Sequence, residues 1–359
     1  MLLFPSLVLP DFPLGSLSIG WNFLNPSLKS ADPTSSEWNE TLVREGQKVV
    51  AWLAEGYISK ETANPQPGDI VILMGFGNKD LQTPVRVAEH YAQFYRQGLV
   101  PVVVFAGGIG RGTRGIVRVF KTYLKENGFA ETEWLKWIEG NLEVNPYDPD
   151  GEKVIREAKI YEGIFKIRLG QLLGAQIDVS KVAIVSDLES NNTGANVQNS
   201  LFKKNKDGQP EPRFEPQSGK FLFLDCFHAP PLVLRADYTL EKQFMEKVQY
   251  KVILRSFPSH AMDLRQMDPA QLLSNVELSL SEIDRIIDYQ KSKEKGGHAE
   301  EPFITPVTIP EEVIISSKKL IHEILTNELI SADWLPQLFE KLEKLTQEKE
   351  RVLEVERMI

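Results

Sequence analysis

One stretch of the chain, residues 181–200 (KVAIVSDLESNNTGANVQNS), limits its fold more than any other. It begins with an apolar, β-branched run at residues 182–185, which predicts a buried strand. A turn of small polar residues follows, and a helix is expected from about Ala195. Such a strand–turn–helix unit is how α/β proteins hold polar ligands, because the helix start offers unpaired N–H groups. The alternative is that the turn residues only cap the helix.

The same alternation recurs along the chain. Further apolar runs predict strands at residues 70–74, 102–105, 221–224 and 251–254. Helical periodicity fills the segments between most of these runs, and it also predicts an amphipathic helix at residues 39–54. Strands that alternate with helices predict an α/β fold with a Rossmann-like, mostly parallel sheet and helices on both faces.

The strand signal stops near residue 267, and only helical patterns follow. We therefore expect an irregular N-terminal arm (1–38), a Rossmann-like α/β domain (39–266) and a helical C-terminal extension (267–359). Prolines and Asp11 interrupt the apolar residues of the arm, which also lacks a basic leader, so neither export nor stable membrane insertion is expected. A cytoplasmic location is the resulting prediction.

Composition argues against several partners. The chain has 41 basic and 50 acidic residues, a net charge of −9, without a basic cluster, so nucleic acid is not an expected partner. Its single cysteine, Cys226, suits a reducing compartment. The 5 histidines are scattered and do not have the spacing of metal ligands, so no metal site is expected. A small-molecule ligand is the partner that the strand ends favour, and the sequence does not specify an oligomeric state.

Four predicted strand ends carry glycines or small polar residues, and in an open parallel sheet such ends meet at one edge. Glycine permits a ligand to approach the backbone closely, while carboxylates accept hydrogen bonds from ribose or ammonium groups. The candidate binding residues on this argument are Gly75, Gly77, Gly107, Gly108, Gly110, Asp187, Ser190, Asn192, Thr193 and Asp225. Each glycine pair on its own is also compatible with a simple tight turn.

The pattern differs from well-known nucleotide sites. Asp80 stands where a dinucleotide fingerprint has its third glycine, and no acidic residue ends the strand at 102–105. A Walker lysine motif and a Gly-x-Ser-x-Gly elbow are both absent from the sequence. Ordinary NAD chemistry is therefore disfavoured.

Two residues are candidates for acid–base chemistry. Glu157 begins a predicted helix, and its alternative role is to lie on a solvated helix face. His228 follows a predicted buried strand, and its alternative role is that of a hydrogen-bonded histidine beside the sheet. Arg235 could pair with a carboxylate or phosphate, but a lone arginine is more often a surface or ion-pair residue. No nucleophile–base pair is evident.

Several short motifs follow one another in a recognisable order. They are Gly46-Gln47-x-Val49-x-x-Trp52-Leu53-Ala54, Asp69-x-Val71-Ile72-Leu73-x-Gly75, Gly107-Gly108-Ile109-Gly110, Arg156-Glu157-Ala158, Ser190-Asn191-Asn192-Thr193-Gly194-Ala195-Asn196, Glu282-Ile283-x-Arg285 and Ile309-Pro310-x-Glu312-Val313-Ile314. This order resembles the SanA/ElyC/YdcF family, a bacterial domain of unknown function, and most closely its YdcF branch. The resemblance extends from about Val43 to Leu325.

The resemblance implies a Rossmann-like domain with a smaller helical part and S-adenosylmethionine as the cofactor, with the reaction unsettled. It adds Asn196, the last residue of the Ser-x-Asn-x-x-x-Asn turn, to the binding candidates. Two departures limit the transfer of roles. Ala195 replaces a glutamate of many members, and His228 and Arg235 are farther apart than in the family's His-x-x-Arg turn.

Three functional hypotheses follow. The first is a cytoplasmic protein that binds a nucleotide-like small molecule, above all S-adenosylmethionine. The second is an enzyme, a transferase or a hydrolase, that acts on a phosphorylated or glycan-precursor substrate of the cell envelope with Glu157 and His228 as acid–base groups. The third is a non-catalytic scaffold whose helical C-terminus recruits a partner.

Overall fold

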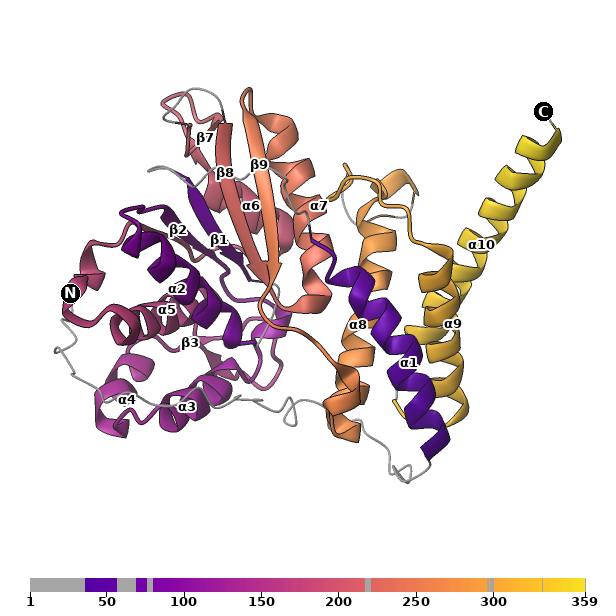
Figure 1. Ribbon diagram of the computed structural model, residues 1–359, viewed down its shortest axis with the longest axis horizontal. Coiled ribbons are helices and arrows are strands. Elements are labelled where there is room, and N and C mark those ends of the chain that lie inside the picture. The colour runs from indigo at the N-terminus through magenta and orange to yellow at the C-terminus, as the bar shows by residue number, and fades with distance from the viewer. Residues whose placement is uncertain are drawn as a thin grey trace. The chain divides into compact units, whose positions relative to one another are not determined.

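The computed structural model describes residues 36–56, 69–75, 80–216, 221–295, 297, 300–330 and 332–358 (Figure 1). The chain divides into two compact units. Of the described residues, those from 56 to 260 belong to an α/β unit, and the helical unit is built from residues 36–55 together with those from 261 onward.

The described part of the α/β unit contains a five-stranded sheet in the order β5-β2-β1-β8-β9, and every pairing in it is parallel. The strands are β1 (Ile70–Met74), β2 (Val102–Ala106), β5 (Ile184–Asp187), β8 (Phe221–His228) and β9 (Lys251–Pro258). All five overlap apolar runs that predict strands, so the expected α/β class with a parallel sheet is confirmed. The run at residues 182–185 predicts a buried strand, but β5 begins at Ile184 and is buried only at Asp187. The arrangement positions five strand ends along one edge.

Helices cover both faces of this sheet (Figure 1). The helices α6 (Thr193–Leu201) and α7 (Val233–Gln243) bury Val197 and Leu240 against Ile72 and Val104 on one face. The helices α2 (Gln82–Arg96) and α5 (Glu157–Leu173) lie on the other, where the ring of Phe165 contacts those of Phe105 and Tyr91. Alternate residues of each buried strand thus contact different helix layers.

Between β2 and α5 the chain makes an insertion of two helices and a short antiparallel pair. Its elements are α3 (Ile116–Glu126), α4 (Glu131–Glu139), β3 (Glu143–Val144) and β4 (Lys153–Val154). A second antiparallel pair, β6 (Phe202–Lys204) and β7 (Pro210–Pro212), lies between α6 and β8 in the chain.

The helical unit contains α1 (Ser36–Leu53), α8 (Pro269–Tyr289), α9 (Glu311–Thr326) and α10 (Leu335–Met358). Helix α1 packs against α8 and α9, whereas the sequence argument placed it in the α/β domain that was expected from residue 39. The reason is that an amphipathic pattern predicts a buried face but does not say which partner covers it. Among the described residues, no helix combines the length and hydropathy needed to cross a membrane.

Two strands are four residues longer than predicted. The sequence argument ended one at residue 254, but β9 continues to Pro258. It ended the other at residue 224 and placed residues 225–228 in a turn, but β8 continues to His228. The cause is its neighbour β9, which pairs with β8 along the whole length from Phe221 to His228. Asp225 is therefore in the middle of a strand and not in a strand-end turn.

Candidate functional site

The carboxyl ends of β1, β2 and β5 lie level with one another. Met74 pairs with Ala106, which pairs with Asp187, so the residues that follow these strands emerge side by side. Gly75 and Gly107 come directly after β1 and β2. Gly77 lies outside the described residues. The structure thus brings the glycine turns and the turn after Asp187 together, as the sequence predicts for a parallel sheet.

The N-terminus of α5 docks on the turn after β2. The backbone N–H groups of Ala158 and Glu157 donate to the carbonyl oxygens of Gly107 (2.8 Å) and Gly108 (3.2 Å). This contact places the Glu157 side chain at the sheet edge, where the residue is only 3% exposed. The alternative of a solvated helix face is therefore wrong. A carboxylate in the first turn of a helix is also stabilised by the helix dipole.

Two glycines are required by this buried glutamate. A Cβ atom on Gly75 would lie 2.1 Å from Oε2 of Glu157, and one on Gly107 would lie 3.1 Å from the same atom. Gly107 also has a φ of 151°, a conformation that favours glycine. The sequence argument attributed these glycines to close approach of a ligand, whereas in the structure the space beside them is filled by Glu157.

Gly108 and Gly110 differ in their surroundings. The N–H of Gly108 donates to the carbonyl of Ser190 (2.7 Å), and a Cβ at Gly108 would lie 2.5 Å from the carbonyl oxygen of Leu188. A Cβ at Gly110 would meet nothing closer than 3.5 Å. Gly110 donates its own N–H to Oγ1 of Thr113 (2.7 Å). Among the described glycines of this turn, Gly110 is the one with space beside it for another molecule.

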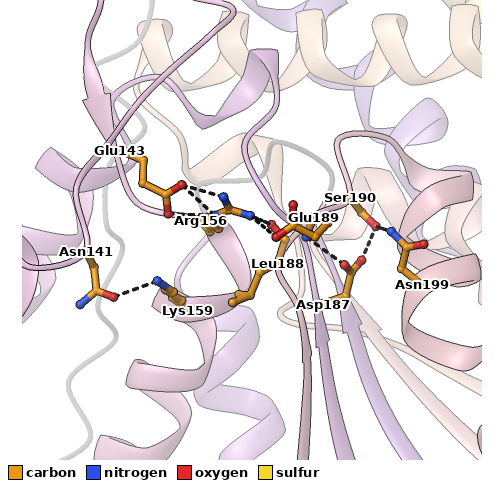
Figure 2. Close-up of polar contacts among 9 residues, drawn as sticks. All are labelled: Asn141, Glu143, Arg156, Lys159, Asp187, Leu188, Glu189, Ser190 and Asn199. Carbon is orange, nitrogen blue, oxygen red and sulfur yellow. Dashed lines mark hydrogen bonds and ion pairs between the residues drawn. The ribbon is translucent and has the colours of Figure 1, made fainter. Parts of the chain in front are cut away.

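The turn after β5 is held by its own side chains. Oδ1 of Asp187 accepts from the N–H of Glu189 (3.0 Å), and Oδ2 accepts from the hydroxyl of Ser190. Nδ2 of Asn199 donates to Oγ of Ser190 (2.9 Å), as Figure 2 shows. Asn192 caps α6, because its Oδ1 accepts from the N–H of Ala195 (2.9 Å). These three predicted binding residues thus have a structural role in shaping the turn.

Arg156 links three segments at this end of the sheet (Figure 2). Its Nε and Nη2 atoms donate to the carboxylate of Glu143 (2.8 and 2.7 Å). Its Nη1 donates to the carbonyl of Leu188 (2.5 Å) and to Oε1 of Glu189 (2.7 Å). The hydrogen bond from Arg156 lowers the pKa of Glu143. The sequence argument assigned Arg156 no role beyond membership of a motif, because its partners are distant in the chain.

The start of α6 connects β1 to a buried arginine. Nδ2 of Asn196 donates to the carbonyl of Gly75, while its Oδ1 is buried and has no hydrogen-bond partner within the described part of the chain. Thr193, on the same face of the helix, accepts through Oγ1 from Nη1 of Arg235 (2.7 Å). Arg235 is only 2% exposed, so the expectation of a surface arginine is wrong.

Glu157, Gly75, Asn196, Thr193 and Arg235 thus form a row of contacting or neighbouring residues, which we call the edge row. It carries a buried acid at one end and a buried guanidinium at the other. Buried charges are costly to desolvate unless each has a partner. Glu157 accepts from Oγ1 of Thr113 (3.5 Å), and Arg235 donates to Thr193, so both charges have partners within the chain.

His228 and Asp225 do not have the roles that the sequence suggested. His228 ends β8 and is buried, and this burial, reinforced by the charge of Arg235, lowers its pKa to about 3. Its imidazole is therefore neutral at physiological pH and a weak proton acceptor. Asp225 accepts from Nε and Nη2 of Arg255 (2.6 and 2.7 Å) and lies 2.7 Å from Nε2 of His90.

A polar cluster that the sequence argument missed lies at the ends of β1 and β9. Asp80, Ser259 and His260 contact one another there. Tyr161 of α5 lies near both acids of this edge: burial raises its pKa well above the usual value, and the charges of Glu157 and Asp80 add to that rise. The sequence argument missed this cluster because it ended the strand at residue 254, whereas β9 continues to Pro258 and is followed directly by Ser259 and His260.

Within the described ranges there is no group of histidine, cysteine, aspartate and glutamate side chains that could hold a metal ion. Comparisons of the chain with protein-family models, curated proteins and solved structures return no match.

Proposed function

We propose that this chain binds S-adenosylmethionine at the carboxyl edge of its parallel sheet. The observation that carries the proposal is the edge row, with buried Glu157 at one end and buried Arg235 at the other. The methionyl part of S-adenosylmethionine has an ammonium, a sulfonium and a carboxylate. A carboxylate suits the two cations, and a guanidinium suits the carboxylate.

Two further features fit this cofactor. Oδ1 of Asn196 is buried without a partner among the described residues, and it is an acceptor that an ammonium group or a ribose hydroxyl can satisfy. Gly110 leaves room beside the backbone of the second glycine turn. When bound, the cofactor would supply an electrophilic methyl group. The order of motifs, which resembles the YdcF branch of the SanA/ElyC/YdcF family, supports the same cofactor.

A second candidate function is an enzyme that acts on a phosphorylated or glycan-precursor substrate. The observation in its favour is the contact between Arg235 and Thr193, because it places a guanidinium in the first turn of α6. A helix N-terminus and an arginine together attract a phosphate group. In this function Glu157 is the acid–base group and not a ligand for a cation.

Calorimetric titration separates the two candidates. The wild-type protein is titrated with S-adenosylmethionine, and with NAD, ATP and a sugar phosphate for comparison. We expect saturable binding of S-adenosylmethionine alone. Glu157→Gln should weaken this binding by about tenfold to a hundredfold, since a hydrogen bond to a charged group contributes about 1.5–3 kcal/mol. Glu126→Gln, at an exposed carboxylate of α3, is the matched control and should change the affinity by less than about twofold.

A second variant tests the same site in case Glu157→Gln does not fold. Gly110→Ala adds one methyl group where nothing lies closer than 3.5 Å, so it should fold normally and bind more weakly. Gly163→Ala, whose added methyl meets nothing within 4 Å in α5, serves as its control. Binding of the sugar phosphate, with loss of turnover but not of binding in Glu157→Gln, would instead establish the second candidate. Binding of neither ligand class would refute both.

A further inference from the structure

The cluster of Asp80, Ser259 and His260 lies next to the edge row but is not part of it. Asp80 comes after β1, and Ser259 and His260 come directly after β9. The N–H of Ser259 donates to the carbonyl of His228 (2.7 Å), which fixes this segment to the end of β8. Asp80 and Ser259 are buried, while the side chain of His260 is 31% exposed. An ordered, partly exposed imidazole thus lies at the ligand-binding edge.

The hydrogen bonds of the cluster determine where its protons lie. Oδ2 of Asp80 is 2.8 Å from Oγ of Ser259, and an ionised carboxylate can only accept. The hydroxyl hydrogen of Ser259 therefore points to Asp80, and its oxygen is left to accept from Nδ1 of His260 at 2.9 Å. His260 is consequently in the Nδ1–H tautomer, with a lone pair on Nε2.

Further hydrogen bonds hold Asp80 in place. Its Oδ1 accepts from the N–H of Gln82 (2.9 Å), and its Oδ2 accepts from the hydroxyl of Thr83 (3.0 Å). The carboxylate of Asp80 can stabilise a positive charge that forms on the imidazole of His260, through the hydroxyl of Ser259. A histidine oriented by a hydrogen-bonded acid is the usual arrangement of a general base.

The contacts of His260 within the described residues are all made through Nδ1, so Nε2 is left for another molecule. His228, by contrast, is buried at the end of β8. Tyr161 of α5 lies near both Asp80 of this cluster and Glu157 of the edge row, since the charges of both carboxylates raise its pKa.

We propose that His260 is the general base of this site, and that Ser259 and Asp80 are its positioning residues. The substrate class is a protic nucleophile, an alcohol or an amine, that accepts the methyl group; this part rests on the proposed function. In the proton transfer the O–H or N–H bond of the acceptor breaks and its proton moves to Nε2 of His260. The bonding electron pair stays on the acceptor atom, which forms the new bond to the methyl carbon. The C–S bond breaks with its electron pair going to sulfur, which becomes a neutral thioether.

The tautomer is measured by ¹⁵N NMR of the full-length protein labelled at its histidine rings. We expect the wild-type His260 to show a protonated Nδ1 and an unprotonated Nε2. Ser259→Ala removes the acceptor for Nδ1–H and should shift His260 toward the Nε2–H tautomer that free imidazole prefers. Thr83→Val is the matched control, because it removes another donor to the same oxygen of Asp80 without touching the imidazole. An Nε2–H tautomer in the wild type, or an equal shift in both variants, would overturn the proposal.

Chemical modification tests whether Nε2 faces the ligand. Diethyl pyrocarbonate acylates the unprotonated nitrogen, and mass spectrometry gives the rate at each histidine. Saturating S-adenosylmethionine should slow modification of His260 at least several-fold but leave exposed His322 of α9 unchanged. If calorimetry shows that the cofactor binds and His260 is not protected, the general base is refuted while the proposed function stands. If calorimetry shows no binding but the tautomer is as expected, the proposed function fails and the oriented base remains.

Discussion

At the scale of single residues, Glu157 explains more of the site than any other side chain. Its carboxylate occupies the space that a Cβ atom would need at Gly75, and it crowds Gly107. Glycine-rich strand ends are usually attributed to close approach of a ligand. Here the glycines make room for a buried acid of the protein. A sequence alone cannot separate these explanations, because Glu157 is distant from both glycines in the chain.

His228 provides a residue-scale prediction about pH. Its pKa falls from 6.5 to about 3 on folding, so the unfolded chain binds a proton in this interval that the folded chain does not. Unfolding free energy must therefore decrease as the pH falls below 6.5. Between pH 7 and pH 5 this group should cost about 2 kcal/mol, at 1.36 kcal/mol for each unit of pKa difference.

Urea unfolding at pH 5 and pH 7 checks this expectation. His228→Asn should remove that part of the pH dependence, whatever its effect on stability at pH 7. His322→Asn, at an exposed position in α9, is the control and should retain it. Equal pH dependence in His228→Asn and the wild type would show that the imidazole is not held neutral.

At the scale of elements, the turn between β5 and α6 shows which local structures can be predicted from neighbouring residues in the sequence. Its residues predict a strand, a polar turn and a capped helix, and the structure contains all three. The cap is Asn192, which was also a candidate ligand residue. The contacts of Arg156 and Arg235 with this region come from other elements, so no local pattern predicts them.

A capping role for Asn192 makes an element-scale prediction. Asn192→Ala should lower the unfolding free energy by about 1 kcal/mol, because the N–H of Ala195 loses its acceptor. Asn192→Ser keeps a capping oxygen and should stay within a few tenths of a kcal/mol of the wild type. Denaturant unfolding of the three proteins measures the difference. Equal losses in both variants would indicate that Asn192 stabilises the protein by some other contact.

At the scale of the whole molecule, the sequence predicts the parallel α/β sheet well and the helical unit less well. Strand assignment succeeded because the five strands are short, apolar and separated by helices. The placement of α1 failed because its partners, α8 and α9, lie at the far end of the chain. That packing buries Glu45, which accepts from Ser316 (2.8 Å) and Arg44 (2.8 Å) and has its pKa lowered to about 2.

The scaffold hypothesis also belongs to the scale of the whole molecule. Leu335, Leu338 and Leu342 of α10 are fully buried, and α10 packs against α9. Deletion of the chain beyond Trp334 would therefore remove part of the core of the helical unit. Loss of assembly after this deletion could therefore result from a folding defect, so the deletion would not by itself identify a surface that binds a partner. These leucines recur at helical spacing, and the helix face that they form packs within its own unit.

Photolabelling with S-[methyl-³H]adenosylmethionine is the most direct test of the account. Ultraviolet irradiation attaches the bound cofactor to residues that it touches, and peptide mapping then locates the label. If the cofactor binds at the edge row, the label should appear in the peptides that contain residues 106–113 or 190–196. Excess unlabelled cofactor should reduce this labelling. Glu157→Gln should reduce this labelling, and Glu126→Gln should not. Label confined to the helical unit, or label that excess cofactor does not displace, would contradict a cofactor site at this edge of the sheet.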